Sequence, residues 1–429
     1  MAPGFSKSML RPQHVDLKLM FPGIRKSTYL THGFDSYPAK MIPHMARFLI
    51  EKISRPGQTI LDPFCGSGSV LIEALLHDRN AIGVDFNTLA IALAVAKTTV
   101  YETSILDKQL EEILRLAIRC NRPHIYDFPN AEYWFTPATL RKLGQLKATL
   151  DQYLPTINPG YAYFWKAVAF SIVRKCSKAD MRGPKPFISK TARVNRAGRH
   201  FDPIRLFEAE ARKWSLIEDR YIEALRASPS RATVNLIHGD SRRLTTLVAN
   251  KKVDVVITSP PYLSAQDYYR SSKLQRLVFE DVSPDKLIEW SRDIIGTDRL
   301  MNGSHLLEAD LPGDLADRIR IKVLARNEKN SKRLAKVFSR YVLDMSKVLA
   351  EIGCILKKGA PCVIVLGYNL MSHIVIPTPE VIIQLASCAG LELEVRYADR
   401  IRDRWVPTIR NGHKGVIDEE HLLVFRKIV

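Results

Sequence analysis

The stretch Thr59-Ile60-Leu61-Asp62-Pro63-Phe64-Cys65-Gly66-Ser67-Gly68-Ser69 decides the fold class of this 429-residue chain. Its first residues predict a short buried strand, the following residues a tight glycine loop, and residues 70–76 an apolar helix. Residues 81–84 predict a second strand, which runs into Asp85 at about the distance where a doubly wound nucleotide fold places its ribose-binding carboxylate. Because glycines let a backbone approach a ligand closely, this order of elements indicates a cofactor half-site.

The glycine loop does not match a dinucleotide fingerprint. A G-x-G-x-x-G pattern that begins at Gly66 and Gly68 requires glycine at position 71, where the chain has Leu71. The loop therefore argues against NAD as the cofactor. A tight turn in an unrelated α/β protein, with Asp85 in solvent, is the alternative interpretation.

The tetrapeptide Ser259-Pro260-Pro261-Tyr262 directly follows an apolar strand predicted at residues 253–258. The exocyclic amine of a nucleobase attacks poorly until acceptors hold its protons, because its lone pair is delocalised into the ring. The prolines remove two backbone donors and favour an extended Ser259, so the serine hydroxyl and the Pro260 carbonyl can be those acceptors. Tyr262 offers a ring on which a flipped base can stack. The tetrapeptide thus predicts amino-group methylation, and a stiff turn with a surface tyrosine is the alternative.

Together these segments resemble the DNA amino-methyltransferases that use S-adenosyl-L-methionine, and more narrowly their N4-cytosine branch, in which the catalytic motif usually reads Ser-Pro-Pro-Tyr. Adenine-N6 enzymes more often carry Asp or Asn in place of Ser259. The resemblance extends upstream to residues 34–43, which in the family close over the methionine end of the cofactor. It implies an α/β class I methyltransferase fold, a Rossmann-like, doubly wound and mostly parallel sheet.

The resemblance also implies a set of site residues. Residues 236–240 look like the third strand, and Asp240 is similar to the acid that meets the adenine ring, although a helix N-cap before Ser241 explains it equally well. The implied catalytic residues are Ser259, Pro260, Pro261 and Tyr262. The implied cofactor-binding residues are Tyr37, Pro38, Asp62, Pro63, Phe64, Cys65, Gly66, Gly68, Asp85, Phe86, Asp240 and Thr258.

Composition fits an enzyme that acts on nucleic acid. The 64 Lys and Arg against 45 Asp and Glu give a net charge of +19, which favours an anionic partner such as duplex DNA. The cysteines show no C-x-x-C pair and no zinc spacing, which predicts reduced thiols without a structural metal. The chain has no apolar stretch long enough for a membrane span and no signal-peptide core, so we expect a cytoplasmic protein.

The order of the predicted elements indicates a split catalytic domain. Residues 1–29 form an N-terminal extension, residues 30–100 and 235–429 the catalytic domain, and residues 101–234 an inserted segment. Helical spacing inside the insertion covers residues 105–118, 137–153, 161–174 and 203–227. After the tetrapeptide we expect helices at 273–295 and 332–356 around a charged irregular stretch, then a strand at 362–366, a helix at 378–389, and an antiparallel pair at 391–397 and 421–425.

A basic segment within the insertion is the candidate for DNA contact. Residues 174–199 hold nine basic residues against the single acid Asp180, with Gly183, Pro184 and Pro186 breaking any regular helix. A loop of this charge can lie along phosphates, which position a duplex without reading its sequence. A solvated surface loop is the alternative. The candidate DNA-binding residues are Arg174, Lys175, Lys178, Arg182, Lys185, Lys190, Arg193, Arg196 and Arg199.

The sequence therefore predicts a site-specific DNA methyltransferase that acts on the N4 amine of a flipped cytosine. The resemblance places it in a restriction-modification or related system, with a cognate restriction endonuclease as a candidate partner. An adenine-N6 DNA methyltransferase and an RNA base methyltransferase are the alternatives, and a nucleic-acid binder without activity is a weaker one. The family's recognition region is best attested at another place in the chain, so the role of residues 101–234 in target recognition is open.

Overall fold

The protein is described by a computed structural model over most of its length. The described residues are 11–16, 28–34, 37, 40–181, 185–192, 201–226, 232–249, 251–263, 268–300, 304–326, 330–371, 374–400, 409–410, 413–414 and 419–428.

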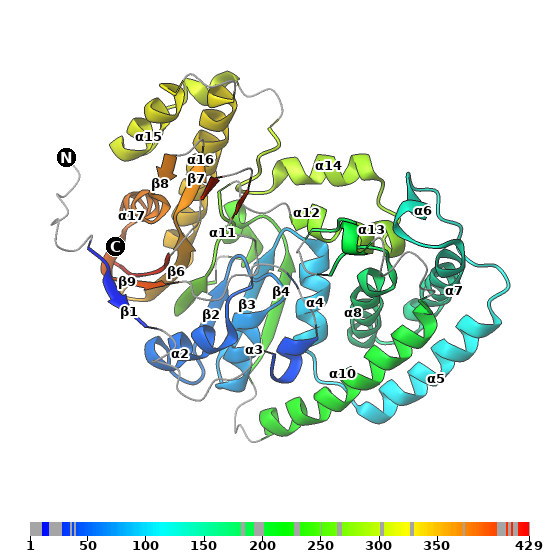
Figure 1. The fold of residues 1–429 in the computed structure, drawn as a ribbon. Coiled ribbons are helices and arrows are strands. Elements are labelled where there is room, and N and C mark those ends of the chain that lie inside the picture. The colour runs from blue at the N-terminus through cyan, green and yellow to red at the C-terminus, as the bar shows by residue number, and fades with distance from the viewer. Residues whose placement is uncertain are drawn as a thin grey trace.

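An eight-stranded sheet runs through the centre of the molecule (Figure 1). Its strand order is β1 (Gln13–Val15), β9 (Leu391–Arg400), β12 (Glu419–Lys427), β6 (Pro361–Gly367), β5 (Val255–Thr258), β2 (Thr59–Asp62), β3 (Asn80–Asp85) and β4 (Val234–His238). All neighbours pair in parallel except β12, which is antiparallel to both β6 and β9. After β1 at one edge, the chain enters the middle of the sheet at β2, proceeds outward to β4, and then returns to β5 on the other side of β2. This doubly wound order confirms the predicted class I methyltransferase fold.

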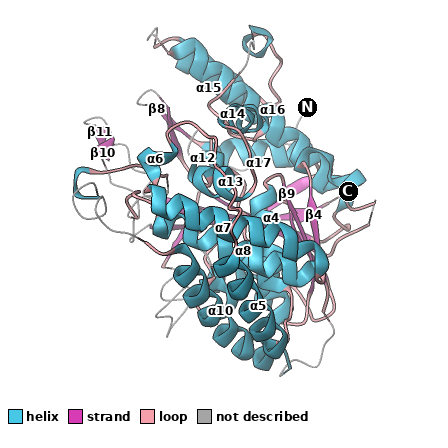
Figure 2. Cartoon of the chain, turned by 90° about the vertical axis from the view of Figure 1, so that its right-hand side faces the viewer, coloured by secondary structure: helices cyan, strands magenta, loops and turns pink. Residues whose placement is uncertain are grey.

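The central strands are buried on both faces, which explains their uninterrupted apolar sequences. In β5, Val255 and Ile257 face a core that also contains residues of α2 (Pro43–Ile53) and α3 (Ser69–Leu76). Val256, between them, faces a core that it shares with α16 (Ser331–Ile355) and α17 (Thr378–Cys388). Helices therefore cover both faces of the sheet (Figures 1 and 2).

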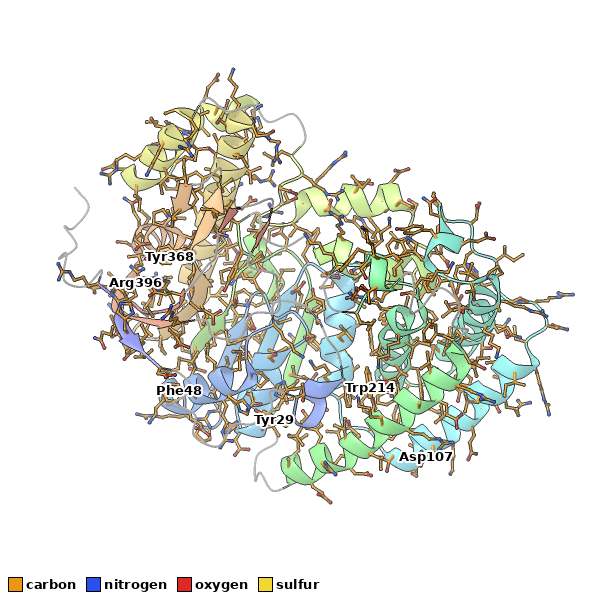
Figure 3. All side chains as sticks on the ribbon, in the orientation of Figure 1. Tyr29, Phe48, Asp107, Trp214, Tyr368 and Arg396 are labelled. Carbon is orange, nitrogen blue, oxygen red and sulfur yellow. The ribbon has the colours of Figure 1, made fainter. Side chains whose placement is uncertain are left out.

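The helices that lie between β3 and β4 in sequence pack outward from α4 (Thr88–Thr98) (Figures 1 and 2). They are α5 (Thr103–Arg119), α6 (Ala131–Trp134), α7 (Pro137–Tyr153), α8 (Pro159–Cys176) and α10 (Pro203–Arg226), with the 3-10 turn η2 (Leu154–Thr156). Their core includes Phe164 and Trp214, and the ring of Trp214 stacks on Phe34 with centroids 4.3 Å apart. Phe34 follows the 3-10 turn η1 (Leu30–Gly33), so α10 anchors the segment that leads to Tyr37 (Figure 3). The helices predicted in this region are confirmed with small shifts at their ends.

One predicted helix is wrong. Residues 273–295 form two helices, α13 (Lys273–Phe279) and α14 (Pro284–Asp293), after the short α12 (Tyr268–Ser271). Asp281 has a φ of 51°, which a continuing helix does not allow. Ser283 then caps a new helix by accepting a bond from the Lys286 N–H, with Pro284 at its first position.

Several short elements had no clear sequence signal. They are β1, the 3-10 turn η4 (Ser304–Leu307), the helix α15 (Asp314–Leu324), and the hairpin strands β7 (Asn369–Met371), β8 (Ile374–Ile376), β10 (Ile409–Arg410) and β11 (His413–Lys414). The 3-10 turn η3 (Ser241–Arg243) and the helix α11 (Leu244–Leu247) follow Asp240, where the alternative interpretation expected a helix to start. The charged stretch before α16 therefore contains α15, whose Ile319 and Val323 pack into the same core as α16. Across the described ranges, no helix combines the length and the apolar character needed to cross a membrane.

The contact between Trp214 and Phe34 makes a stability prediction. Replacing the fully buried Trp214 by Ala should lower the free energy of unfolding by about 3–5 kcal/mol, the usual range for removing a buried aromatic side chain. Urea unfolding measures this change in the free energy of unfolding. Leu216→Ala is the matched control on the same helix, because Leu216 is 69% exposed and its loss should cost less than about 0.5 kcal/mol. Equal losses for the two variants would contradict the role of Trp214 as an anchor.

Candidate active site

The predicted site residues converge because neighbouring parallel strands end at the same edge of the sheet. Asp62 ends β2, Asp85 ends β3, Asp240 follows β4 and Ser259 follows β5. A cavity at this edge is lined by Tyr37, Phe64, Gly66, Asp85, Phe86, Asn87, Asp240, Ser241, Ser259, Pro261, Asp293, Ile294 and Ile295. One pocket thus joins residues from the glycine loop, the ends of β3 and β4, the closing segment (residues 34–43) and the Ser-Pro-Pro-Tyr tetrapeptide.

The glycine loop adopts backbone conformations that favour glycine. Gly66 has a φ of 51° and Gly68 a φ of 86°, and Gly68 is the N-cap of α3. A Cβ added at Gly66 would lie 3.4 Å from the ring of Tyr37, and one at Gly68 3.2 Å from Ala94 on α4. The loop is therefore held close to both the closing segment and α4.

Asp85 is the central acid of the pocket. One carboxylate oxygen accepts the Gly66 N–H at 2.9 Å, and the other accepts the Asn87 N–H at 2.8 Å. Burial raises the pKa of Asp85 to about 6, while these two backbone bonds act in the opposite direction. Each oxygen keeps acceptor capacity after its backbone bond, as a carboxylate that binds two ribose hydroxyls requires.

Asp62 and Thr258 lie behind the pocket instead of lining it. The Thr258 hydroxyl donates to Asp62 at 2.7 Å, and the Phe64 N–H donates to the same oxygen at 3.1 Å. Burial raises the pKa of Asp62 to about 7, against the lowering effect of these two bonds. The pair joins the ends of β2 and β5 and so fixes the glycine loop relative to residues 259–262, which we call the catalytic loop after their predicted role.

Other predicted cofactor residues also sit outside the lining. The Pro63 carbonyl accepts a bond from the Ser241 hydroxyl, which ties the glycine loop to the loop after β4. Cys65 is buried, and burial raises the pKa of its thiol well above the usual value. Pro38 lies outside the described residues. Pro63 and Cys65 shape the loop that forms the pocket without lining it.

Asp240 combines the two roles that its sequence left open. It lines the pocket, and its side chain also caps η3 by accepting the Arg242 N–H at 2.9 Å. Burial would raise the pKa of Asp240, but the bonds from the Arg242 guanidinium outweigh burial and lower it. Arg242 in turn contacts Asp344 of α16 at 2.9 Å. The acid therefore stays ionised and fixed in place.

The tetrapeptide presents alternate residues to the pocket. Ser259 and Pro261 line it, whereas Pro260 is buried between them. The Tyr262 hydroxyl donates to Glu420 of β12 at 3.1 Å, which holds the ring on the β12 side of the catalytic loop.

The pocket wall opposite the strand ends was missed from the sequence. Asp293, Ile294 and Ile295 lie at the end of α14 and just after it, and the next residue, Gly296, has a φ of 80°. A Cβ at Gly296 would lie 2.8 Å from the Tyr262 carbonyl oxygen, so this chain segment crosses directly over the catalytic loop. No local sequence pattern predicts such a long-range contact. Asn87 and Ser241 also line the pocket and were not predicted. Each lies just after the end of a strand, and this position in the sequence could have identified them as candidates.

The chain just before the closing segment is tied to α3 by a buried polar cluster that was also missed. The Tyr29 hydroxyl donates to Glu73 at 2.5 Å, and Nε2 of His32 lies 2.6 Å from the same carboxylate oxygen. Burial raises the pKa of Glu73 to about 7. Within the closing segment, the Tyr37 hydroxyl accepts a bond from the Asn87 amide at 2.9 Å. Tyr29, which precedes that segment, is labelled in Figure 3.

The basic segment is described only in part. Arg182, Arg193, Arg196 and Arg199 lie outside the described residues. Among the others, Arg174 donates to the Asp180 carbonyl at 2.5 Å, Lys175 pairs with Glu210 at 2.5 Å, and Lys178 donates to the Glu132 carbonyl at 2.7 Å. Lys185 is half-buried and Lys190 is exposed. Within the described chain, no cluster of three or more His, Cys, Asp or Glu side chains is arranged to hold a metal ion.

The comparisons agree with this pocket. The DNA methylase family model N6_N4_Mtase matches residues 6–96, which contain the closing segment, the glycine loop and Asp85. The Type II methyltransferase M.MvaI of Kocuria varians is 24% identical over 377 residues, or 83% of this chain and 81% of that protein. The Type II methyltransferase M.MjaII of Methanocaldococcus jannaschii is 22% identical, over 61% of this chain and 65% of that protein.

Among solved structures, the rRNA methyltransferase AviRa from Streptomyces viridochromogenes aligns with a TM-score of 0.33 and 11% identity, over 91% of this chain and 87% of that one. Gly66 of the glycine loop, Asp85 and the flanking Phe64 and Phe86 line one cavity. The DNA methylase family model that matches residues 6–96 supports S-adenosylmethionine as the cofactor. The family match, the sheet order and the pocket together support a DNA amino-methyltransferase.

Proposed function

We propose that the chain transfers a methyl group from S-adenosylmethionine to the N4 amine of a flipped cytosine in duplex DNA, within a restriction-modification system. One observation carries the proposal: Ser259 and Pro261 line the same cavity as Asp85 and Asp240. A cofactor held by the two acids would therefore lie beside the tetrapeptide. Serine at position 259, where adenine-N6 enzymes more often have Asp or Asn, favours cytosine.

The proposed chemistry uses acceptors placed around the attacking nitrogen. S-adenosylmethionine supplies the electrophilic methyl group. The Ser259 hydroxyl and the Pro260 carbonyl accept hydrogen bonds from the two amine N–H groups, which directs the nitrogen lone pair out of conjugation and toward the methyl carbon. One of these protons is released to solvent after the nitrogen has gained the methyl group. The ring of Tyr262, held through its bond to Glu420, gives the flipped base a stacking surface. No covalent bond between enzyme and base is required.

Ser259→Ala tests this role. Single-turnover transfer of labelled methyl groups to duplex DNA, at saturating cofactor, should slow by about 10 to 1,000-fold, the range for losing one preorganised electrostatic partner. Cofactor and DNA affinities should stay near the wild-type values, because the bond matters most as the amine loses its conjugation. Ser283→Ala, at the cap of α14, is the control and should keep the wild-type rate. A wild-type rate for Ser259→Ala would remove the tetrapeptide from the catalytic centre.

We also propose that residues 101–234 form the insertion that contacts the DNA backbone, through the basic segment 174–199. Lys185 and Lys190 lie in the central part of that segment, and Lys190 is exposed. Phosphate contacts of this kind bind all sequences alike and release counterions.

Replacing Lys185 and Lys190 by Gln should weaken binding to any duplex and reduce the log-log salt slope by about 0.9 for each phosphate that is no longer neutralised. Fluorescence anisotropy across a salt series measures the slope. Lys357→Gln is the matched control, because Lys357 lies outside the basic segment and its ammonium already pairs with the Asp254 carboxylate. An unchanged slope in the double variant would mean that these two lysines do not contact the phosphates.

A further inference from the structure

Arg276 is a fully buried cation that lies next to the cofactor pocket but does not line it. It belongs to α13, the helix that follows the catalytic loop and α12. Its guanidinium donates to the amide oxygen of Asn87 and, at 3.1 Å, to the hydroxyl of Thr88. A guanidinium at a buried position needs such partners, and both come from the start of α4.

Two further contacts fix the guanidinium itself. Glu280, one turn along α13, accepts a bond from Arg276 at 2.6 Å. The ring of Trp290 on α14 lies 5.4 Å from the guanidinium carbon, within cation–π range. Arg276 is therefore held by α13 and α14 and reaches across to α4.

Asn87 connects Arg276 to the pocket. Its backbone N–H donates to Asp85 at 2.8 Å, and its amide nitrogen donates to the Tyr37 hydroxyl at 2.9 Å. Its amide oxygen accepts from the Leu89 N–H at 3.0 Å as the N-cap of α4. Asn87 thus contacts Asp85, the closing segment and the first turn of α4.

The chemistry of arginine determines how this amide is oriented. A guanidinium has only donors, so the Asn87 atom that faces it must be the oxygen. With the oxygen turned to Arg276 and the Leu89 N–H, the amide nitrogen faces Tyr37 and the Tyr37 hydroxyl must act as acceptor. Removing Arg276 leaves the amide oxygen with one donor and opens space behind the loop that carries Asp85.

We propose that Arg276 is a positioning residue for the cofactor: through Asn87 it orients Asp85 and Tyr37, so that cofactor affinity depends on the helix that follows the catalytic loop. The inference rests on the proposed function only in taking S-adenosylmethionine as the ligand of the pocket. On this proposal, α13, which follows the catalytic loop in sequence, also contributes to cofactor binding.

Calorimetric titration of S-adenosylmethionine into the full-length variants tests the proposal. Asp85→Ala serves as the reference for loss of a direct contact. Arg276→Met should weaken binding by roughly 10-fold, in line with loss of charged hydrogen bonds. Arg276→Lys should lie between Met and wild type, because one ammonium keeps the charge but cannot match the planar fork that reaches both Asn87 and Thr88. At saturating cofactor, methyl transfer by Arg276→Lys should remain within about threefold of wild type, so the KM for cofactor changes more than kcat.

A double-mutant cycle tests the route through Asn87. Tyr37→Phe removes the hydroxyl that accepts the amide bond, and in the Arg276→Met background it should cause little additional loss of affinity. Arg79→Met is the matched control: Arg79 is 7% exposed, is bonded to Ser54 and His77, and lies away from the pocket. It should lower the melting temperature without changing the dissociation constant of the cofactor.

Wild-type affinity in folded Arg276→Met and Arg276→Lys would overturn the proposal. Fully additive losses in the cycle would overturn the route through Asn87 and Tyr37, and an equal loss of affinity in Arg79→Met would reduce Arg276 to a general structural residue. The proposed function can fail independently of this inference. If cofactor binding depends on Arg276 but the wild-type protein does not methylate DNA, the positioning role of Arg276 stands and the proposed function is wrong.

Discussion

The pocket depends on the half-buried carboxylate of Asp85. Its two oxygens hold the backbone of the glycine loop through Gly66 and the start of α4 through Asn87. Both loops follow strands that end at the same edge of the sheet, so the carboxylate joins segments that sheet topology has already brought together. The closing segment adds a further contact, because Tyr37 lies across Gly66 and bonds to Asn87.

Burial of two acids near the pocket reduces the stability of the folded protein. Burial raises the pKa of Asp85 to about 6 and that of Asp62 to about 7. Since both values lie above those of the unfolded chain, the folded state binds more protons between about pH 4 and pH 7, and these groups make the protein less stable as the pH rises through that range. Asp240 is the opposite case, because Arg242 lowers its pKa despite burial. Carboxylates kept buried at a loss of stability are typical of functional sites.

Local pattern was enough for the strands that carry the site. The apolar runs before Asp62, Asp85 and Ser259 predicted β2, β3 and β5, and the glycine loop predicted the turn between β2 and α3. The sequence could not predict contacts made between distant segments, such as Ile295 and Gly296 over the catalytic loop or Arg276 on Asn87. The long helix expected after the tetrapeptide failed for a local reason, since Ser283 and Pro284 start a new helix. The roles of the site residues stay predictions, and so does the contact of the basic segment with DNA.

The choice of cytosine over adenine is the central claim of the proposed function. It rests on serine at position 259 in a pocket that also holds Asp85 and Asp240. The most direct measurement is mass spectrometry of nucleosides from duplex DNA and from RNA, each incubated with the protein and isotope-labelled S-adenosylmethionine. The account predicts labelled N4-methylcytosine from DNA and none from RNA. Labelled N6-methyladenine from DNA, or label found only in RNA, would contradict it.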